Sequence, residues 1–489
     1  MTAGALAVYG VLIAAAVVAV LRRPAVALYL FVLGLPLHNI VMSLLYGGGV
    51  RGHALDAIQA WKEVLLAAAL LAVVSNSLLL SRPPFRPHWL DGLGFAFAAV
   101  VVLYALIPQS ALGGHAGTRA ILYGLRHDLV PVAAYFLGRA VAPELRRVGA
   151  VIVVAAAAVA AWGLVEVYAV PIEWWRHSGA VGYFHRELGY DYHGPAGLPE
   201  NFAFNSSDGL FRRLVSTFVS PLATAYMLLV ALLLLAVDRR HPRAAAALGV
   251  VTAAGLLWTF SRSSIVALGG GLVVLAVALR RWWPLGAAAV VAAGGLAFAS
   301  AFHEIAPRTH WFESDLPYQE AQRKAKGPLP TDSGLKGTVS IGEPSIRSHW
   351  DSLKAGVRIV VHHPQGFGLG NAGTTAQRFD VKLEAGESNY TELGAETGIA
   401  GALLFIAWSL GLVAVLLRTA WAGDRAAAAV GAALAAVLAL GVQTDTIGVP
   451  WLAYCLFWLA GALVTTRFYE KLPSPEIESS EMGDGRSAP

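Results

Sequence analysis

The residue types most able to do chemistry gather in one stretch of this chain, between Ser345 and Gly398. It reads SIRSHWDSLKAGVRIVVHHPQGFGLGNAG and continues, after a short spacer, as ESNYTELGAETG. Arginine, histidine, glutamate and asparagine stand close together here, beside an apolar run. Arginine binds phosphate oxygens through paired hydrogen bonds, and a carboxylate can accept the proton of a hydroxyl group. The stretch therefore predicts chemistry at a membrane surface.

Two further arginines stand beside apolar runs. Arg262 lies between two such runs, flanked by Ser261, Ser263 and Ser264. A charged side chain at membrane depth is costly and usually faces a cavity or a partner, although an arginine that reaches toward lipid phosphate is the alternative. Arg213 opens the run RLVSTFVSPLATAYM, and either an anchoring role or a place in a site fits its position.

Acidic residues precede and enter the next polar-to-apolar boundary. Glu387 comes just before an apolar run, where a negative charge also suits a helix N-terminus. Glu392 lies inside the run, one helical turn before Glu396. It could form a buried ion pair with an arginine such as Arg347 or Arg358. A carboxylate among arginines at a dry interface is also a candidate general base.

No metal or cofactor is expected. His362 and His363 are adjacent, so on a helix they point about 100° apart and do not form a metal-binding pair; structural or supporting roles fit them best. No cluster of histidine and aspartate elsewhere suggests a divalent cation. The one cysteine, Cys455, lies in an apolar run and is expected to be a small core residue, so no disulfide framework can form within one chain.

A helix and a turn must position the polar stretch. Apolar residues recur with helical spacing at Ile346, Trp350, Leu353, Val357, Val360 and Val361. This pattern predicts an amphipathic helix over 345–362 that lies flat on the membrane surface. His363-Pro364 should end it, and the turn GFGLGN follows. Glycines in that turn would let the backbone approach a ligand closely.

The rest of the chain has the composition of a protein embedded in lipid. Of its 489 residues, 56% are hydrophobic and 14% charged, against about 25% charged residues in soluble domains. With about 20 apolar residues needed for each spanning helix, about 13 spans are predicted. They lie at 4–21, 25–45, 57–80, 90–107, 120–141, 149–170, 214–237, 244–260, 264–279, 285–303, 389–417, 426–445 and 449–466. The pair 244–260 and 264–279 could be one helix, but Arg262 would then stand at membrane depth.

The distribution of charge orients these spans. Arginines cluster in short connections, starting with Arg22-Arg23, and every later basic turn falls on the same side. This positive-inside bias predicts a cytoplasmic C-terminus and an N-terminus outside. It also explains the net charge of +5 without nucleic-acid binding, because no basic stripe is interleaved with stacking aromatic residues. The first run lacks the features of a cleaved signal peptide and is expected to stay as a span.

The predicted organisation is an all-α polytopic membrane protein in six parts. N-terminal spans fill 1–170, and central spans with the Ser-Arg motif fill 214–303. Two long external segments, 171–213 and 304–388, separate the groups of spans. The second of these is the largest polar insertion and is expected to be catalytic, because long loops are usually functional or disordered. C-terminal spans fill 389–467, and the polar tail at 468–489 is expected to be disordered.

Three blocks together resemble the O-antigen ligase and polymerase family of polytopic membrane glycosyltransferases. RLVSTFVSPLATA is similar to the family's Arg-x-x-Gly-Thr-Phe-x-Asn-Pro segment, with Ser216 for Gly and Ser220 for Asn. TFSRSSIVALGGG is similar to its Ser-Arg-centred helix pair. RSHWDSLKAGVRIVVHHPQGFGLGN, followed by ESNYTELGAETGIAG, resembles its external lid and exit helix. The resemblance covers roughly residues 210–415.

The resemblance implies a donor glycan on a polyprenyl diphosphate in the outer leaflet of the bacterial cytoplasmic membrane. The acceptor would be a glycan or a lipid-linked glycan. Arg213, Arg262 and Arg347 would bind the diphosphate, and Glu387 would take the proton of the acceptor hydroxyl. The helix at 345–362 would be a lid over the cleft. Further contacts to the substrate are expected from Arg358, His362, His363, Asn371, Tyr390 and Glu392.

One departure from the family pattern bears on the reaction. Ligases of this family have a histidine eleven residues before the glycine that corresponds to Gly398, and here that position is Glu387. Polymerase-like members often carry an acidic residue there, so polymerisation is favoured over ligase-type transfer to lipid A core. A transporter of lipid-linked glycans is the alternative. Transporters tend to have internal repeats, whereas the polar residues of this chain are concentrated in its C-terminal half.

Overall fold

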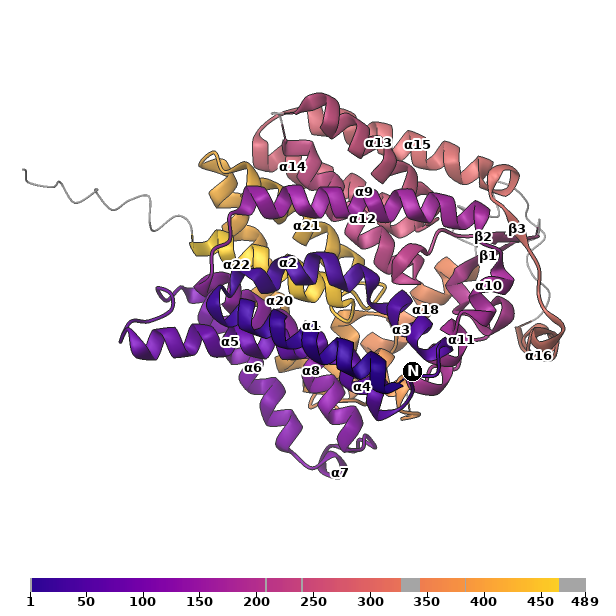
Figure 1. Cartoon of the computed structure of the whole chain (residues 1–489), viewed down its shortest axis with the longest axis horizontal. Coiled ribbons are helices and arrows are strands. Elements are labelled where there is room, and N and C mark those ends of the chain that lie inside the picture. The colour runs from indigo at the N-terminus through magenta and orange to yellow at the C-terminus, as the bar shows by residue number, and fades with distance from the viewer. Residues whose placement is uncertain (1, 207–208, 239–240, 327–343, 383, 466–489) are drawn as a thin grey trace, which may run out of the picture.

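The computed structural model of the chain describes all residues except 1, 207–208, 239–240, 327–343, 383 and 466–489 (Figure 1). Helices make up most of the described chain, and its strands form one small sheet. The predicted fold class, an all-α polytopic membrane protein, is confirmed. The tail at 468–489, for which we expected disorder, lies outside the described residues.

The long helices follow one another along the chain as the apolar runs predict. The N-terminal group is α1 (Thr2–Arg22), α2 (Ala25–Gly34) with α3 (His38–Gly47), α5 (Trp61–Leu79), α6 (Trp89–Leu106), α8 (Thr118–Ala140) and α9 (Leu145–Ala169). The central group is α12 (Pro221–Val237), α13 (Pro242–Trp258), α14 (Arg262–Leu279) and α15 (Trp283–Ile305). The C-terminal group is α20 (Asn389–Trp421), α21 (Arg425–Leu440) and the π-helical turn η7 (Leu452–Leu456) with α22 (Phe457–Thr465). Every predicted run overlaps at least one of these helices.

By length and composition, eight of the described helices could cross a membrane. The helices α12, α13, α21 and η7–α22 are shorter, and α8 carries charged residues. The pair 244–260 and 264–279 is two helices, with Arg262 as the first residue of the second. Two predicted spans are wrong in extent, because α12 begins only at Pro221 and α21 already ends at Leu440.

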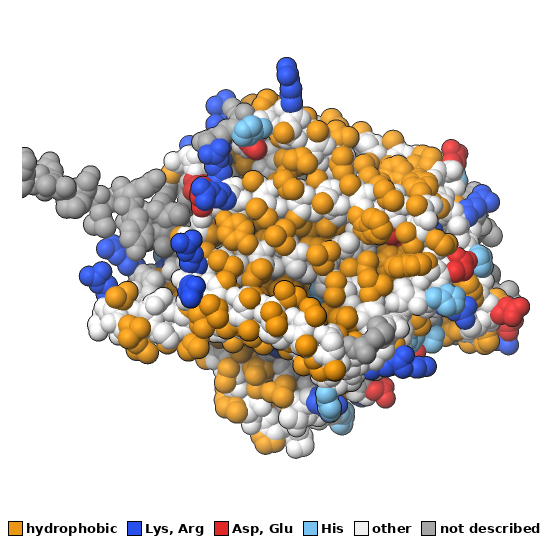
Figure 2. Space-filling view, in the orientation of Figure 1, with side chains coloured by type: hydrophobic (Ala, Val, Ile, Leu, Met, Phe, Trp, Pro, Cys, Tyr) orange, Lys and Arg blue, Asp and Glu red, His pale blue; other side chains and the backbone are white. Residues whose placement is uncertain are grey.

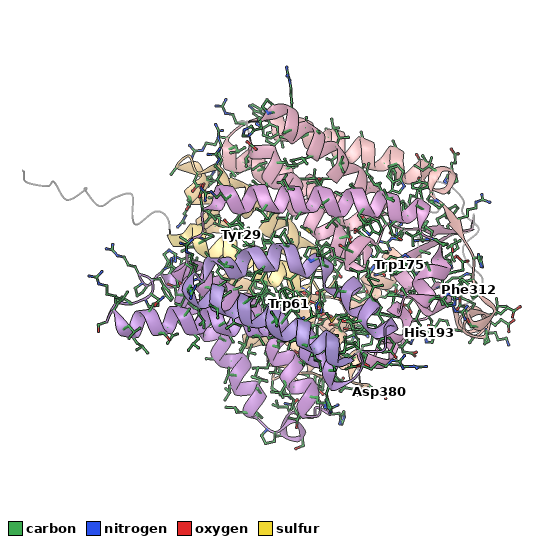
Figure 3. The ribbon with its side chains drawn as sticks, viewed as in Figure 1. Tyr29, Trp61, Trp175, His193, Phe312 and Asp380 are labelled. Atoms are coloured by element: carbon green, nitrogen blue, oxygen red, sulfur yellow. The ribbon has the colours of Figure 1, made fainter. Side chains whose placement is uncertain are left out.

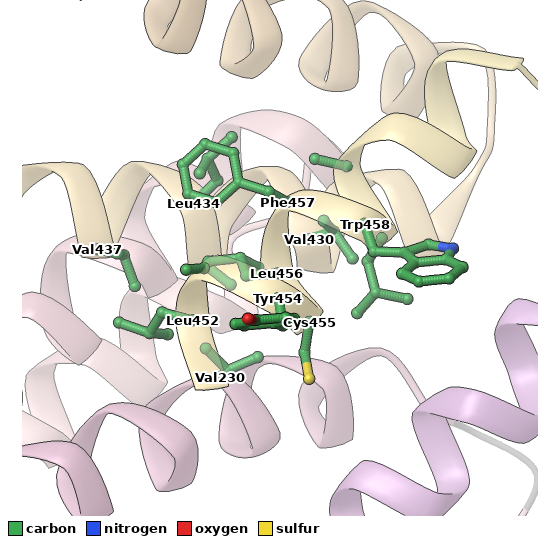
Figure 4. Close-up of a cluster of buried hydrophobic side chains, with 14 of the residues drawn as sticks. Val230, Val430, Leu434, Val437, Leu452, Tyr454, Cys455, Leu456, Phe457 and Trp458 are labelled. Atoms are coloured by element: carbon green, nitrogen blue, oxygen red, sulfur yellow. The ribbon is translucent and has the colours of Figure 1, made fainter. Parts of the chain in front are cut away.

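Close helix contacts form the centre of the membrane part. The helix α8 packs along α22, while α20 lies between α6 and α21. Gly138 of α8 faces the backbone of α22 so closely that a Cβ there would lie 2.1 Å from the Trp458 carbonyl oxygen. Glycine permits this approach because it lacks a side chain. Cys455 is buried in the same region, beside Tyr454 and Trp458 (Figure 4), which fits the expected core role.

The two ends of the molecule differ in charge (Figure 2). Exposed arginines such as Arg22, Arg82 and Arg281 belong to what we call the basic end. A broad hydrophobic surface covers the middle of the molecule, as expected for a protein surrounded by lipid. The opposite end, with mixed charge and histidine, carries the sheet and the lid helix, and we call it the lid end (Figure 1). Trp175, His193 and Phe312 lie there (Figure 3).

A small sheet at the lid end joins the two long polar segments. The strand β2 (Gly209–Arg212) pairs antiparallel with β1 (Ala203–Ser206) and with β3 (Arg308–Thr309). Phe204 and Phe211 form one cross-strand pair and pack on a cluster of phenylalanines at the ends of α13 and α15. The sequence pattern did not predict these strands, which are only two to four residues long.

Several short helices complete the lid end and the connections. They are α4 (His53–Gln59), α7 (Gln109–Leu112), α10 (Ile172–His177), α11 (Ala180–Gly182), α16 (Leu316–Lys326) and α19 (Gly373–Arg378). The lid helix α18 (Pro344–His362) has the predicted extent to within one residue. It packs on α20, where Val360 lies against Gly394.

The apolar side of α18 is divided, contrary to our prediction of one apolar face. Val360 packs against the protein, whereas Trp350, Val357 and Val361 are about half or more exposed, at 57%, 49% and 62%. These three residues recur at helical spacing and form an apolar row that faces away from α20. Its contact with a membrane surface stays a prediction.

Candidate active site

The structure brings Arg213 and Arg262 together at the junction of the sheet and two central helices. The Arg213 backbone N–H donates to the Phe202 carbonyl at 3.1 Å, which continues the end of β2. Its side-chain Nε donates to the Thr259 carbonyl at 2.8 Å. Thr259 belongs to the turn between α13 and α14, immediately before Arg262. The polar turn thus places two guanidinium groups, far apart in sequence, at one site.

The electrostatics of this pair favour an anion. Burial, together with the charge of Arg262, lowers the pKa of Arg213 to about 9. No described carboxylate is among the groups that shift this pKa. A cation held near another cation and away from water is stabilised by a bound negative charge. The site also includes the N-terminus of α14, where the helix dipole attracts anions.

The surrounding residues fix the Arg262 side chain and the turn. Its guanidinium carbon lies 5.5 Å from the ring centre of Phe204 and 5.9 Å from that of Phe260. Phe260 has a left-handed backbone conformation with φ of 48°, and the Oγ atoms of Ser261 and Ser264 are 2.7 Å apart. The serines around Arg262 thus bond to one another and shape the turn.

Glu387 lies at the point where the lid helix meets α20. Its Oε2 and His349 Nδ1 are 2.5 Å apart, and the two side chains are 50% and 40% exposed. Glu387 has φ of 70°, which is unusual for a residue with a side chain and marks a constrained position. The carboxylate is therefore accessible and carries a histidine partner from α18. Sequence reasoning identified Glu387 but not His349.

The lid loop docks onto a break in α20. Gly398 interrupts this helix with φ of 70°, and the carbonyls freed by the break accept hydrogen bonds from the loop after α18. Phe367 N–H donates to the Ala395 carbonyl at 2.6 Å, and Gly368 N–H to the Glu396 carbonyl at 3.0 Å. The glycine-rich turn is therefore used for close backbone packing.

A second polar centre, which sequence reasoning missed, lies beside the lid loop. His127 of α8 stands between two carboxylates, with Nδ1 2.8 Å from Asp128 Oδ1 and Nε2 3.1 Å from Asp445 Oδ2. Asp445 also accepts from the Gly448 N–H at 2.7 Å and the Thr374 hydroxyl at 3.2 Å. Ionisable residues inside the run at 120–141 were the available signal, because such residues are usually functional.

Glu392 and Glu396 lie in this second centre. They line a small cavity of about 10 Å³ together with His127, Asp128 and Thr375, a space of about one water molecule. Glu396 Oε1 accepts from the Gly370 N–H at 2.8 Å. The alternative of a buried ion pair between Glu392 and an arginine of the lid is wrong, since both such arginines are exposed on α18. Within the described residues, no group of three or more acidic, histidine or cysteine residues could hold a metal ion.

Two residues that we predicted to contact the substrate form hydrogen bonds within the protein. Asn371 is buried, and its Oδ1 accepts from the His115 and Ala116 N–H groups at 2.7 and 3.0 Å. Its Nδ2 donates to Gln109 Oε1 at 2.8 Å. His363 stacks on Phe367, and its Nε2 lies 3.2 Å from the carbonyl of Leu112. These residues fasten the lid loop to α7, and a sugar contact from either stays a prediction.

The other predicted site residues differ in exposure. Arg347 and Arg358 are exposed on α18, and no described hydrogen bond or ion pair joins them to the pair Arg213 and Arg262. His362 is exposed, with Nδ1 2.8 Å from the Arg358 carbonyl oxygen. The Tyr390 hydroxyl donates to the Leu438 carbonyl at 2.7 Å. Their contacts with a substrate stay predictions.

The fold and site define a class: an all-α membrane protein with two neighbouring arginines at a helix N-terminus and an accessible carboxylate beside α18. A family model described as O-antigen ligase matches residues 247–406, which form a domain of that family. The match includes Arg262, the lid helix and Glu387, and leaves out Arg213 and Asp445. No curated protein matches the chain. The family indicates glycan transfer of the O-antigen ligase or polymerase type.

Proposed function

We propose that this protein polymerises glycan from a polyprenyl-diphosphate-linked donor, with ligase-type transfer to a separate acceptor as the second possibility. The observation that carries the proposal is the pair Arg213 and Arg262, two guanidinium groups at the N-terminus of α14. A diphosphate leaving group gains negative charge as its bond to the sugar breaks. Preorganised cations and N–H groups stabilise that charge without needing a general acid.

The proposed step joins two glycans. The acceptor hydroxyl oxygen attacks the anomeric carbon of the donor sugar, and the bond from that carbon to the diphosphate oxygen breaks. The electron pair stays on the diphosphate, held by Arg213 and Arg262. Glu387 takes the hydroxyl proton, which suits an accessible carboxylate. Arg347 would add a further phosphate contact from the lid helix.

The remaining polar residues would contact the sugars or hold the lid. Arg358 and His362 are exposed on α18 and accessible to a glycan, whereas Tyr390 and Glu392 lie deeper along α20. His363 and Asn371 would act indirectly, because their polar atoms already fasten the lid loop. No metal or cofactor takes part in the proposed step.

We place the reaction at the outer face of the bacterial cytoplasmic membrane. Lysine and arginine gather at the basic end (Figure 2), and such a bias marks the cytoplasmic side. The arginine pair, Glu387 and the lid helix belong to the opposite end. A lipid-linked donor could enter from the outer leaflet, beside the apolar row of α18. Glu387 in place of the ligase histidine is the reason to favour polymerisation.

The experiment that tests the proposal uses purified protein and a polyprenyl-diphosphate oligosaccharide from the same host, without added metal. We expect Arg262→Ala to lower transfer by about 100-fold, a typical loss for one group that stabilises a developing anion. Arg281→Ala, an exposed arginine at the basic end, is the matched control and should retain transfer.

The product pattern separates the alternatives. A ladder of longer lipid-linked glycans indicates a polymerase, and a single shift on a separate acceptor indicates a ligase. Glu387→Gln should lose the ladder while still binding the donor. Donor binding without product, with several donors, would contradict the proposal and favour a transporter.

A further inference from the structure

We propose that His349 is a positioning residue of the reaction centre, which reaches from the lid helix and holds the Glu387 carboxylate in the orientation that accepts the proton of the acceptor hydroxyl. This inference rests on the proposed function, in which Glu387 takes that proton. It also has a consequence for the lid. Because His349 belongs to α18, the carboxylate is held in place only while this helix lies on α20.

The face of α18 that packs on the protein includes His349. From 347 to 362, the buried and half-buried positions recur every three or four residues, at His349, Ser352, Leu353, Gly356, Ile359 and Val360. The other residues of this range are exposed. A spacing of three and four residues places side chains on one face of a helix. His349 therefore stands near the N-terminal end of the face that packs on α20.

Close contacts along this face fix where His349 lies. Gly356 packs on Thr391 so closely that a Cβ there would lie 2.7 Å from the Thr391 Oγ1 atom. One turn further, Val360 lies against Gly394, where a Cβ would be 2.8 Å from the Val360 Cγ2 atom. A glycine on each helix permits this approach, because it has no side chain. These contacts hold α18 on α20, and His349 meets Glu387 on the same face, before the first of them.

The backbone around Glu387 is fixed by its buried neighbours. The Gly373 N–H donates to the Ala385 carbonyl at 3.0 Å, and the Asn389 N–H donates to the Gly441 carbonyl at 2.9 Å. Ala385 and Asn389 are buried on either side of Glu387, which itself has the left-handed φ of 70°. Strained residues that their surroundings hold in place gather at functional sites. The backbone of Glu387 is thus fixed, but its long side chain still needs a partner that holds the carboxylate.

His349 provides that partner. Its Nδ1 atom lies 2.5 Å from Glu387 Oε2. An ionised carboxylate can only accept, so the imidazole donates this hydrogen bond from Nδ1–H. Hydrogen bonds to a charged group are shorter and stronger than those between neutral groups. In the described part of the chain no other donor bonds to this carboxylate, so Oε1 is the oxygen that can accept from a hydroxyl group of the substrate.

The stability of the fold does not account for the pair. Both side chains are exposed, at 40% for His349 and 50% for Glu387, and an ion pair in contact with water contributes little to folding. The left-handed backbone of Glu387 costs free energy. An arrangement that is strained and exposed, yet has a short hydrogen bond, fits a site that keeps a reacting group accessible to its substrate.

The proton transfer stays balanced with His349 in this role. The acceptor oxygen forms its bond to the anomeric carbon as the bond from that carbon to the diphosphate oxygen breaks. The acceptor proton moves to Glu387 Oε1, and the electron pair of the broken bond stays on the diphosphate. His349 keeps its proton on Nδ1 and contacts only the carboxylate.

The first test replaces His349 by alanine. Without the imidazole the carboxylate can rotate, so we expect kcat to fall between about 10-fold and 100-fold, as for other residues that support a reacting group. Donor binding should change by less than about threefold. His53→Ala, at a fully exposed histidine of α4, is the matched control and should retain kcat. Native kcat in folded His349→Ala would overturn the inference.

Two amide replacements test which ring nitrogen matters. Asparagine places an N–H group close to the position of Nδ1, whereas glutamine places it near the position of Nε2. His349→Asn should therefore recover most of the rate that His349→Ala loses, and His349→Gln should recover little. Equal rates for the two variants would contradict a hydrogen bond from Nδ1 as the cause.

A double substitution separates positioning from independent action. Glu387→Gln removes the carboxylate that His349 holds, so adding His349→Ala to it should cause no further loss of the residual kcat. A further loss as large as that of His349→Ala alone would show that His349 acts without Glu387, and the inference would be wrong.

The dependence on the lid is tested at a residue that touches neither partner. Gly356→Val introduces a side chain where even a Cβ would meet Thr391, so it should displace α18 and lower kcat as His349→Ala does. Ala355→Val introduces the same residue at the preceding, exposed position and should retain kcat. Native kcat in Gly356→Val would contradict the dependence on the lid.

The outcomes separate this inference from the proposed function. If the native protein binds the lipid-linked donor and forms no product, the proposed function fails. If the native protein makes product and His349→Ala makes it equally fast, only the role of His349 fails.

Discussion

At the scale of single residues, the surroundings of Arg213 and of Asp445 treat their charges in opposite ways. Arg213 is a cation whose surroundings disfavour its charge, and Asp445 is an anion that several donors support. The first environment is suited to hold a negative group of a ligand. The second is suited to remain negative itself.

The lowered pKa of Arg213 predicts a pH dependence of donor binding. The protonated arginine binds phosphate, and the fraction protonated falls as the pH rises through about 9. Affinity for a polyprenyl diphosphate should therefore decrease above this pH by about tenfold for each further unit, as expected for the loss of one required proton. Titration of the purified protein with the lipid diphosphate at several pH values measures this. Constant affinity up to pH 10.5 would show that Arg213 does not contact the phosphate.

Lysine at this position provides a stricter comparison. Arg213→Lys keeps a positive charge but has a lower intrinsic pKa and lacks the planar fork that grips two phosphate oxygens. We expect weaker donor binding at neutral pH and a loss of binding that begins at lower pH than in the native protein. An unchanged pH profile would mean that another group sets the alkaline limb.

Several of these residues could be identified from the sequence and others could not. Arg213, Arg262 and Glu387 stand at boundaries between polar and apolar runs, which a single pass along the chain detects. The contact of His127 with Asp445 joins positions 318 residues apart, and no local pattern carries that information. Asn371 shows a limit of another kind, because a residue type does not reveal which partner its amide binds. Its residue type suggests sugar binding, whereas its amide is used to fasten a loop.

At the scale of elements, the lid depends on the break in α20. The sequence pattern predicted α18 and the glycine-rich turn, but it could not predict that α20 is interrupted at Gly398, because the surrounding run is continuously apolar or helix-forming. The break frees carbonyl groups that the loop after α18 then binds. The strands β1, β2 and β3 could not be predicted, because two to four residues are too few to show a period-two pattern.

This dependence predicts a specific effect of Gly398→Ala. Alanine would have to adopt φ of 70°, and its Cβ would lie 2.7 Å from the Pro364 carbonyl oxygen. The strain of such a conformation alone costs about 1–3 kcal/mol. We expect a lower apparent melting temperature and slower glycan transfer, because the loop after α18 would lose its hydrogen bonds to the break in α20. Thermal unfolding in detergent, together with the transfer assay, measures both effects.

The control for this prediction is Gly286→Ala in α15. Gly286 is helical, and a Cβ there would meet nothing within 4 Å. Alanine is favoured over glycine in a helix by about 1 kcal/mol, so stability should stay equal or increase. If both variants had the same stability and the same rate of glycan transfer, the break at Gly398 would have no special role.

At the scale of the whole molecule, the orientation in the membrane decides which compartment the site faces. A hydrophobic surface separates the basic end from the lid end, and the asymmetry of charge predicts that the basic end faces the cytoplasm. Because the run count is odd, the two chain ends would lie on opposite sides. The buried Cys455 is the single cysteine of the chain, so new cysteines can be introduced into the native background and each will be the one reactive thiol.

Labelling with a membrane-impermeant maleimide therefore tests the orientation. Asp380 is exposed at the lid end, near α19, and Arg281 is exposed at the basic end. In cells whose cytoplasmic membrane is intact but whose surface is accessible, the Asp380→Cys variant should react and the Arg281→Cys variant should react only after permeabilisation. The native protein should stay unlabelled, because Cys455 is fully buried. The reverse pattern would place Arg213, Arg262 and Glu387 on the cytoplasmic side, where the donor would have to be consumed before it crosses the membrane.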